Sequence, residues 1–311
     1  AMGAFGPSCD VTDNLAVLKA NERANAYGLD AISTGMSIAF VMECSEKGLI
    51  TTEDTGGIEY RWGDADLMLR SVEMIAHRQG FGDIMAEGVD RMSKQFGPET
   101  AAANITVKGQ ELPMHEPRAK VAMGLGYAVA PVGADHMMNS HDREFARPGG
   151  GLDRVNEALD PPAEPVSWKV FNEEKMRIFT TEVNWKHFQD CALNCHFYDY
   201  EYHHLAQALS GVSGVEYTIH DVLNVGARAQ TLSRLFNLRE GFTVEDDVLP
   251  RRVMTAFEEG PLQGVEITDE DFAWARSRFY ELMDWDPDTG VPTEECLQKL
   301  GLGTLMEEIG K

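Results

Sequence analysis

Apolar residues recur every three or four positions along most of the chain, which is the pattern of an amphipathic helix. We expect helices in the segments 64–80, 83–97, 218–241, 268–282 and 293–300. Each begins at a residue whose side chain can accept a hydrogen bond from a free backbone amide of the first turn. These residues are Asp64 or Asp66, Asp83, Thr218 with Asp221, Thr268 with Asp271, and Thr293. The alternation typical of strands is nearly absent, and only 105–112 could hold a short extended piece. The sequence therefore predicts an all-α, multi-helical chain.

The length of 311 residues suits about two domains. Periodicity is lost over 100–117, so we expect a boundary near residue 104, with one helical domain at 1–104 and a second at 105–311. The segment 147–168 is rich in Gly and Pro. It predicts a long surface excursion that is either functional or mobile.

The overall charge limits the choice of partner. The 27 basic and 51 acidic residues give a net charge of −24, which argues against nucleic acid and against an anionic membrane. The longest uncharged stretch, 121–134, is too short to span a bilayer. Five irregularly spaced cysteines do not make a disulfide scaffold, and they favour a reducing cytoplasm.

A short pattern occurs twice, as Asn-Ala-Tyr-Gly-Leu-Asp at 25–30 and as Asp-Cys-Ala-Leu-Asn-Cys at 190–195. In the first hexapeptide Gly28 permits a tight turn, and Asp30 offers an acceptor for the N–H groups of a ring. Ser33 or Thr34 is expected to cap the helix that follows, whose free amides favour a phosphate. The alternative is an ordinary helix end and turn.

The second hexapeptide holds Cys191 and Cys195, which share one face if the segment is helical. Two buried thiols are the alternative to a metal or cluster role, because a cubane cluster needs four thiolates. A zinc site is a further alternative, with ligands from the histidines that follow: His196, His203 and His204.

His136 ends a segment that begins with the glycine-rich apolar run 124–129. A histidine there can transfer protons near neutral pH, and a structural histidine is the alternative.

Several stretches together resemble the tungsten-containing aldehyde ferredoxin oxidoreductase family, in the family's order and over essentially the whole chain. They are 27–50, 78–89, 108–113, 124–128, 234–241 and 247–250. The resemblance implies a tungsten or molybdenum ion held by two pterins, which oxidises aldehydes to carboxylates. The electrons would leave through a [4Fe–4S] cluster to ferredoxin or another carrier. The chain resembles the family's two helical domains, which pack around a cofactor cleft.

The resemblance also assigns residues. One pterin would be held by Asn25, Gly28, Leu29 and Asp30, and the other by Asp190 and Asn194. Cys195 would be the fourth cluster ligand, and His136 would move protons near the metal. Two departures stand out: Asn25 replaces a typical Asp, and Leu193-Asn194 replaces the usual Gly-Leu.

The family's remaining cluster cysteines and its β domain precede the part that this chain resembles. One thiolate cannot hold a cubane, so we expect this chain alone to lack cofactors and activity, and the missing N-terminal domain to be its partner. A homodimer is left open. The alternatives are aromatic acyl-CoA reductase chemistry within the same family and a non-catalytic helical binding module.

Overall fold

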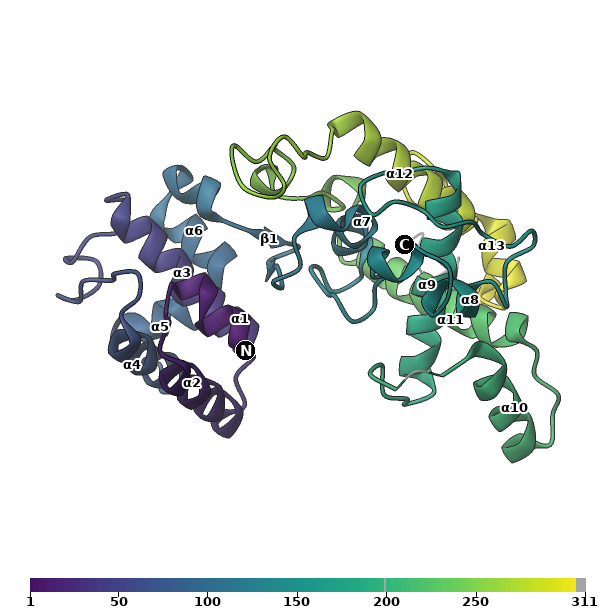
Figure 1. Ribbon diagram of the computed structural model, residues 1–311, viewed down its shortest axis with the longest axis horizontal. Helices are drawn as coiled ribbons and strands as arrows, with labels where there is room; N and C mark the ends of the chain where they lie inside the picture. The colour runs from purple at the N-terminus through teal and green to yellow at the C-terminus, as the bar shows by residue number, and fades with distance from the viewer. Residues whose placement is uncertain (199, 306–311) are drawn as a thin grey trace. The chain divides into compact units, whose positions relative to one another are not determined.

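The computed structural model of the protein describes residues 1–198 and 200–305. It forms two compact units (Figure 1). The first holds residues 1–114 and 250–252, and the second holds the rest of the described chain. The prediction of an all-α, multi-helical chain is confirmed. Within the described ranges, the strands β1 (Thr106–Val107) and β2 (Gln110–Glu111) form one small antiparallel hairpin, inside the segment expected to be extended.

The first unit is built around α3. Its helices are α1 (Met2–Phe5), α2 (Asn14–Tyr27), α3 (Ala31–Glu46), α4 (Ala65–Ala76), α5 (Phe81–Met85) and α6 (Val89–Phe96), with the short 3₁₀ helices η1 (Pro7–Cys9) and η2 (Pro98–Ala103). The residues from Ile38 to Met42 are all buried, so α3 is enclosed by its neighbours. A Cβ added at Gly35 would lie 2.7 Å from the Cβ of Ala4, so only glycine lets α1 pack directly on α3.

Two expectations for the first unit have different outcomes. The helix near 64–80 is confirmed as α4, and Asp64 caps it by accepting a hydrogen bond from the Leu67 amide at 2.9 Å. The single helix expected at 83–97 is wrong, because Gly88 has φ +85° and ψ 168° and separates α5 from α6. Asp83 lies inside α5 and is not its cap.

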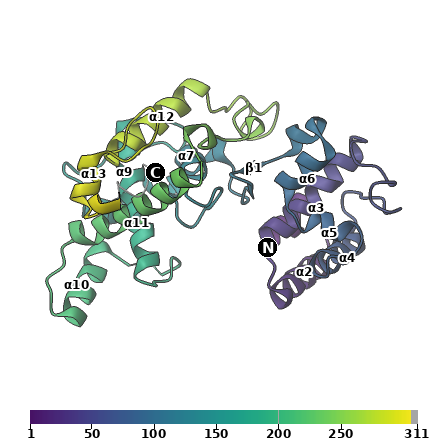
Figure 2. The ribbon, with the colours of Figure 1, turned by 180° about the vertical axis from the view of Figure 1, so that it is seen from behind.

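The second unit is built around two long helices, α9 (Glu173–Cys191) and α11 (Ile219–Arg239), which lie side by side in both views (Figures 1 and 2). A Cβ at Gly226 of α11 would lie 1.7 Å from the backbone oxygen of Asn184, so glycine sets this close approach. The other α-helices are α7 (Val121–Val129), α8 (Gly151–Val155), α10 (Tyr202–Ser213), α12 (Asp269–Leu282) and α13 (Glu294–Lys299). The 3₁₀ helices of this unit are η3 (Pro117–Ala119), η4 (Asp142–Phe145), η5 (Val244–Asp246) and η7 (Gly303–Leu305). The remaining one, η6 (Arg251–Val253), begins in residues assigned to the first unit and ends at the first residue of the second.

The three threonine caps predicted for this unit are confirmed. The hydroxyls of Thr218, Thr268 and Thr293 each accept a hydrogen bond from an amide in the first turn of α11, α12 and α13, respectively. The Asp221 carboxylate in turn accepts a hydrogen bond from the Thr218 amide, which completes the expected capping box.

The prediction that 147–168 is a surface excursion is wrong. The segment contains α8, and its side chains at Leu152, Val155, Ala163 and Val166 are buried with Phe145 in one apolar cluster. Most of the segment is loop, as expected. The few apolar side chains among its glycines and prolines are buried, and they pack the segment against the rest of the unit. None of the described helices is long and apolar enough to cross a bilayer.

Candidate functional site

The first hexapeptide joins α2 to α3 in the first unit. Gly28 ends α2 with φ +69°, and the Leu29 amide donates to the Ala24 oxygen at 2.8 Å. Asp30 then caps α3, because its Oδ1 accepts the Ser33 amide at 2.6 Å. The expectation that Ser33 or Thr34 caps this helix is therefore wrong.

The same segment stays open to a ligand. Asn25, Gly28 and Asp30 are all exposed, and Leu29 is half-buried. Apart from Gly28 and its two neighbours in the chain, no described residue has a heavy atom within 4 Å of a Cβ added at Gly28. The hexapeptide thus serves as an ordinary helix end and turn, and it also presents a carboxylate beside open space.

The second hexapeptide ends α9 in the second unit. The helix stops at Cys191, and Leu193 has φ +57°, a conformation that usually selects glycine. The Asn194 amide donates to the Gln189 oxygen at 2.9 Å, and the Leu193 amide to the Asp190 oxygen at 3.0 Å. Cys195 lies beyond the end of this helix. The two cysteines would share one helix face only if the helix continued to residue 195, and it does not.

The five cysteines are free thiols, and only Cys191 and Cys195 are exposed. Partial burial, and then the Asp190 carboxylate, raises the pKa of the Cys191 thiol. The zinc alternative is wrong for the described residues, since no group of three or more His, Cys, Asp or Glu side chains among them could hold a metal ion. His203 instead places its Nδ1 2.9 Å from Glu157 Oε1.

His196 connects the second hexapeptide to the loop that carries His136. Its Nε2 lies 2.5 Å from Asp190 Oδ1, and its Nδ1 lies 3.1 Å from the oxygen of Met137. The side chain is only 8% exposed, whereas that of Asp190 is 51% exposed. His196 therefore fixes Asp190 from the protein side and leaves the carboxylate accessible.

His136 belongs to a cluster that the sequence did not reveal. Its ring centroid lies 5.1 Å from that of His115, which lies 5.1 Å from that of His141. Lys120 Nζ lies 3.2 Å from His115 Nδ1 and 3.0 Å from His141 Nδ1. These residues follow no local spacing rule, so only the fold could bring them together.

Burial controls the electrostatics of this cluster. Burial, followed by the charge of Lys120, lowers the pKa of both His115 and His141 to about 4. Burial also lowers the pKa of Lys120. At neutral pH the two imidazoles are thus uncharged, and their lone pairs are available to accept hydrogen bonds.

The cluster is held in place at the start of α7. Asp142 is fully buried and accepts the amides of Ala122 and Met123, each at 3.1 Å, which anchors the segment of His141 to that helix. Lys175 of α9 donates to the same carboxylate at 2.5 Å. A helix N-terminus favours such a carboxylate.

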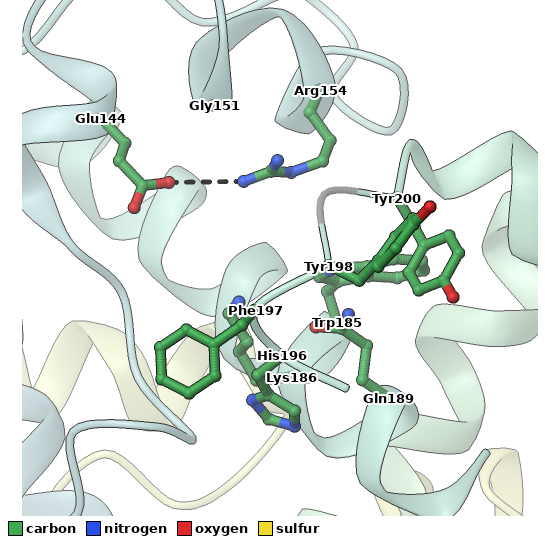
Figure 3. A pocket seen from close by; sticks show the side chains of 10 residues that line it. All are labelled: Glu144, Gly151, Arg154, Trp185, Lys186, Gln189, His196, Phe197, Tyr198 and Tyr200. Atoms are coloured by element: carbon green, nitrogen blue, oxygen red, sulfur yellow. Dashed lines mark hydrogen bonds and ion pairs between the residues drawn. The ribbon is translucent and has the colours of Figure 1, made fainter. Parts of the chain in front are cut away.

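A pocket of about 430 Å³ lies beside the second hexapeptide (Figure 3). Arg154 of α8 extends across one wall toward Glu144, with 3.3 Å between Nη2 and Oε2. The buried Gln189 of α9 also lines the pocket, and its Oε1 has no hydrogen-bond partner among the residues that the structure describes. The lining residues are Glu144, Gly151, Arg154, Trp185, Lys186, Gln189, His196, Phe197, Tyr198 and Tyr200.

The predicted site residues thus form two sets. Asn25, Gly28, Leu29 and Asp30 lie in the first unit. Asp190, Asn194, Cys195 and His136 lie in the second, where the bonds of His196 bring their loops together. The groups that these residues and the pocket present are suited to a polar heterocycle and to a thiolate that binds a cluster. They are accessible carboxylates, a buried amide oxygen without a partner among the described residues, aromatic faces, cations and one exposed thiol beyond the helix.

Comparisons with known proteins identify relatives over nearly the whole chain. The family described as "Aldehyde ferredoxin oxidoreductase, domains 2 & 3" matches residues 1–302. The chain is 32% identical to tungsten-containing aldehyde ferredoxin oxidoreductases of Pyrococcus furiosus and of Pyrococcus abyssi, over 96% of its own length and 47% of theirs. It therefore spans about half the length of these curated relatives.

One solved structure shares the fold. It is the "Active site complex BamBC of Benzoyl Coenzyme A reductase in complex with 1,5 Dienoyl-CoA", with a TM-score of 0.71 and 21% identity. The similarity covers 94% of this chain and 47% of that one.

Proposed function

Because the chain belongs to the aldehyde ferredoxin oxidoreductase family, we propose that it forms the helical part of a tungstopterin enzyme that oxidises aldehydes to carboxylic acids. The observation that carries this proposal is the presence of both hexapeptides on accessible loops, one ending in Asp30 and the other in Cys195. The electron acceptor would be ferredoxin or another carrier. A binding module without redox function would not require these groups.

In this proposal the chain's residues hold and orient the cofactors. Asn25, Gly28, Leu29 and Asp30 bind one pterin, and Asp190 and Asn194 bind the other. The tungsten, or molybdenum, bis-pterin and the [4Fe–4S] cluster supply the two-electron chemistry when they are bound.

Three further residues act around these groups. His196 orients the Asp190 carboxylate through its 2.5 Å contact. Cys195 contributes one thiolate to the cluster, and the other three come from a part of the enzyme outside this chain. His136 handles one of the two protons that oxidation of an aldehyde by water releases, because an imidazole can accept a proton and pass it on.

The test uses the full-length enzyme, with measurement of tungsten, iron and aldehyde-dependent reduction of ferredoxin. We expect Cys195→Ser to lose the cluster iron, and Cys191→Ser, which alters the other exposed thiol, to retain it. Full iron content in Cys195→Ser would contradict the assignment.

A second pair of variants tests proton handling. His136→Asn should lower turnover by about 10²-fold or more and leave the tungsten content unchanged. The exposed His204 provides the matched control, and His204→Asn should leave turnover unchanged. An aromatic acyl-CoA, assayed in parallel, checks the alternative substrate; turnover of that thioester without aldehyde oxidation would reject the proposed reaction.

A further inference from the structure

The pocket beside the second hexapeptide adjoins the groups proposed to hold the pterin but is not built from them. Among the described residues that line it, neither Asp190 nor Asn194 appears. His196 connects the two places, because it lines the pocket and its Nε2 contacts Asp190 Oδ1 at 2.5 Å. Its Nδ1 lies 3.1 Å from the oxygen of Met137, the residue after the proposed proton-handling His136. The pocket is therefore free to take a ligand other than the pterin, next to the proposed reaction site.

Much of the pocket wall is aromatic. Tyr198 and Tyr200 both line it, with their ring centroids 4.8 Å apart and 30° between the ring planes. Phe197 and Tyr198 are 87% and 66% exposed, so large ring surfaces face solvent at the pocket. An aromatic ligand that packs on these rings removes apolar surface from water, and it gains ring–ring contacts that a saturated ligand does not make.

Lys186 supplies an available positive charge in the same wall. It is half-buried, and its ammonium has no hydrogen bond or ion pair with any residue that the structure describes. The other lining cation, Arg154, has Glu144 at 3.3 Å and Glu182 at 4.0 Å. Figure 3 shows Arg154 and Glu144 together on one side of the pocket, and Lys186 with the aromatic side chains on the other. An ammonium group only donates hydrogen bonds, and it donates most strongly to an ionised acceptor.

We propose that this pocket binds a planar aromatic carboxylate, with its ring against Phe197 and Tyr198 and its carboxylate at Lys186. The inference rests on the proposed function for one point only, namely that this acid is the product and the matching aromatic aldehyde is the substrate. One aromatic aldehyde and one water give the aromatic acid, two protons and two electrons, and the electrons leave to the carrier. Phe197, Tyr198 and Lys186 are then the residues that determine specificity.

The test is carbon-13 NMR of the 311-residue chain with ring-labelled phenylalanine and tyrosine at pH 7, titrated with three ligands. Sodium benzoate should shift the ring signals of Phe197 and Tyr198 to saturation, with Phe197→Ser and Tyr198→Ser used for assignment. Sodium cyclohexanecarboxylate keeps the charge without the aromatic ring, and it should bind about threefold or more weakly than benzoate. Benzyl alcohol keeps the ring without the charge, and it should bind about tenfold more weakly.

Two variants separate the contribution of the charge from that of the rings. Lys186→Met should weaken benzoate binding about tenfold and leave benzyl alcohol binding unchanged. Phe197→Ser should weaken the binding of both ligands about threefold, because it removes a ring face that both of them use. The exposed Lys169 lies outside the pocket and supplies the control, so Lys169→Met should change neither affinity.

Equal affinities for benzoate and cyclohexanecarboxylate would overturn the proposal, as would undiminished benzoate binding by Lys186→Met or unshifted Phe197 and Tyr198 signals. If Lys186→Met does not fold, the comparison of the three ligands in the unmodified chain still decides. The experiment needs no cofactor. Failure to bind benzoate therefore leaves the proposed reaction standing, and a full-length enzyme without aldehyde oxidation leaves the aromatic carboxylate site standing.

Discussion

Replacing Lys175 by Met should destabilise the second unit by about 3–5 kcal/mol, because it leaves a buried charge without its partner. Lys175 and Asp142 are 1% and 0% exposed, and Nζ and Oδ1 are 2.5 Å apart. In the variant the carboxylate keeps only the two amides at the start of α7. The loss is a large part of the roughly 5–15 kcal/mol that stabilises a typical domain.

The assay is urea unfolding followed by tryptophan fluorescence, because every tryptophan except Trp62 lies in the second unit. Lys299→Met is the matched control. Lys299 pairs with Asp284 at the surface, where its side chain is 64% exposed, so its replacement should change the free energy of unfolding by less than about 0.5 kcal/mol.

A double variant separates the ion pair from general packing. Asp142→Asn removes the charge but keeps an oxygen that can accept an amide of α7. The double variant Lys175→Met/Asp142→Asn should therefore be less destabilised than Lys175→Met alone, with a coupling energy of about 2 kcal/mol. If the two losses simply add, the reasoning about an uncompensated charge is wrong.

Three further predictions concern the same unit. Leu193→Gly should raise the free energy of unfolding by about 0.5–1 kcal/mol, since Leu193 has φ +57° and is 93% exposed; a decrease in the urea midpoint would refute this. Gly126→Ala should cost about 1–3 kcal/mol, because its Cβ would lie 1.7 Å from Asn139 Oδ1, and the further change Asn139→Ala should recover part of the loss. His115 and His141 have folded-state pKa values of about 4, below the ordinary 6.5. The unfolded chain therefore takes up more protons between pH 6.5 and 4, and the urea midpoint should fall as pH falls through that window. His115→Gln should reduce this fall; parallel curves for the variant and the unmodified chain would count against it.

Several local features could be predicted because their causes lie within a few residues. The threonine caps of α11, α12 and α13 need only a hydroxyl one residue before an apolar periodic run. The all-α class follows from the same periodicity. The division of 83–97 into two helices was missed because a Gly at position 88 is tolerated in many helices, and only its backbone angles show the break.

The candidate site also combines features that the sequence predicts with features that only the folded chain creates. Each hexapeptide is one continuous stretch of sequence. The sequence alone therefore marks Asp30, Asp190 and Cys195 as candidate binding groups. Neither the contact of His196 with Asp190 nor the cluster around Lys120 has a sequence signal, because burial and hydrogen bonding between distant segments create them. A local pattern fixes which side chains are available, whereas the environment that sets their charge and tautomer exists only after the chain has folded.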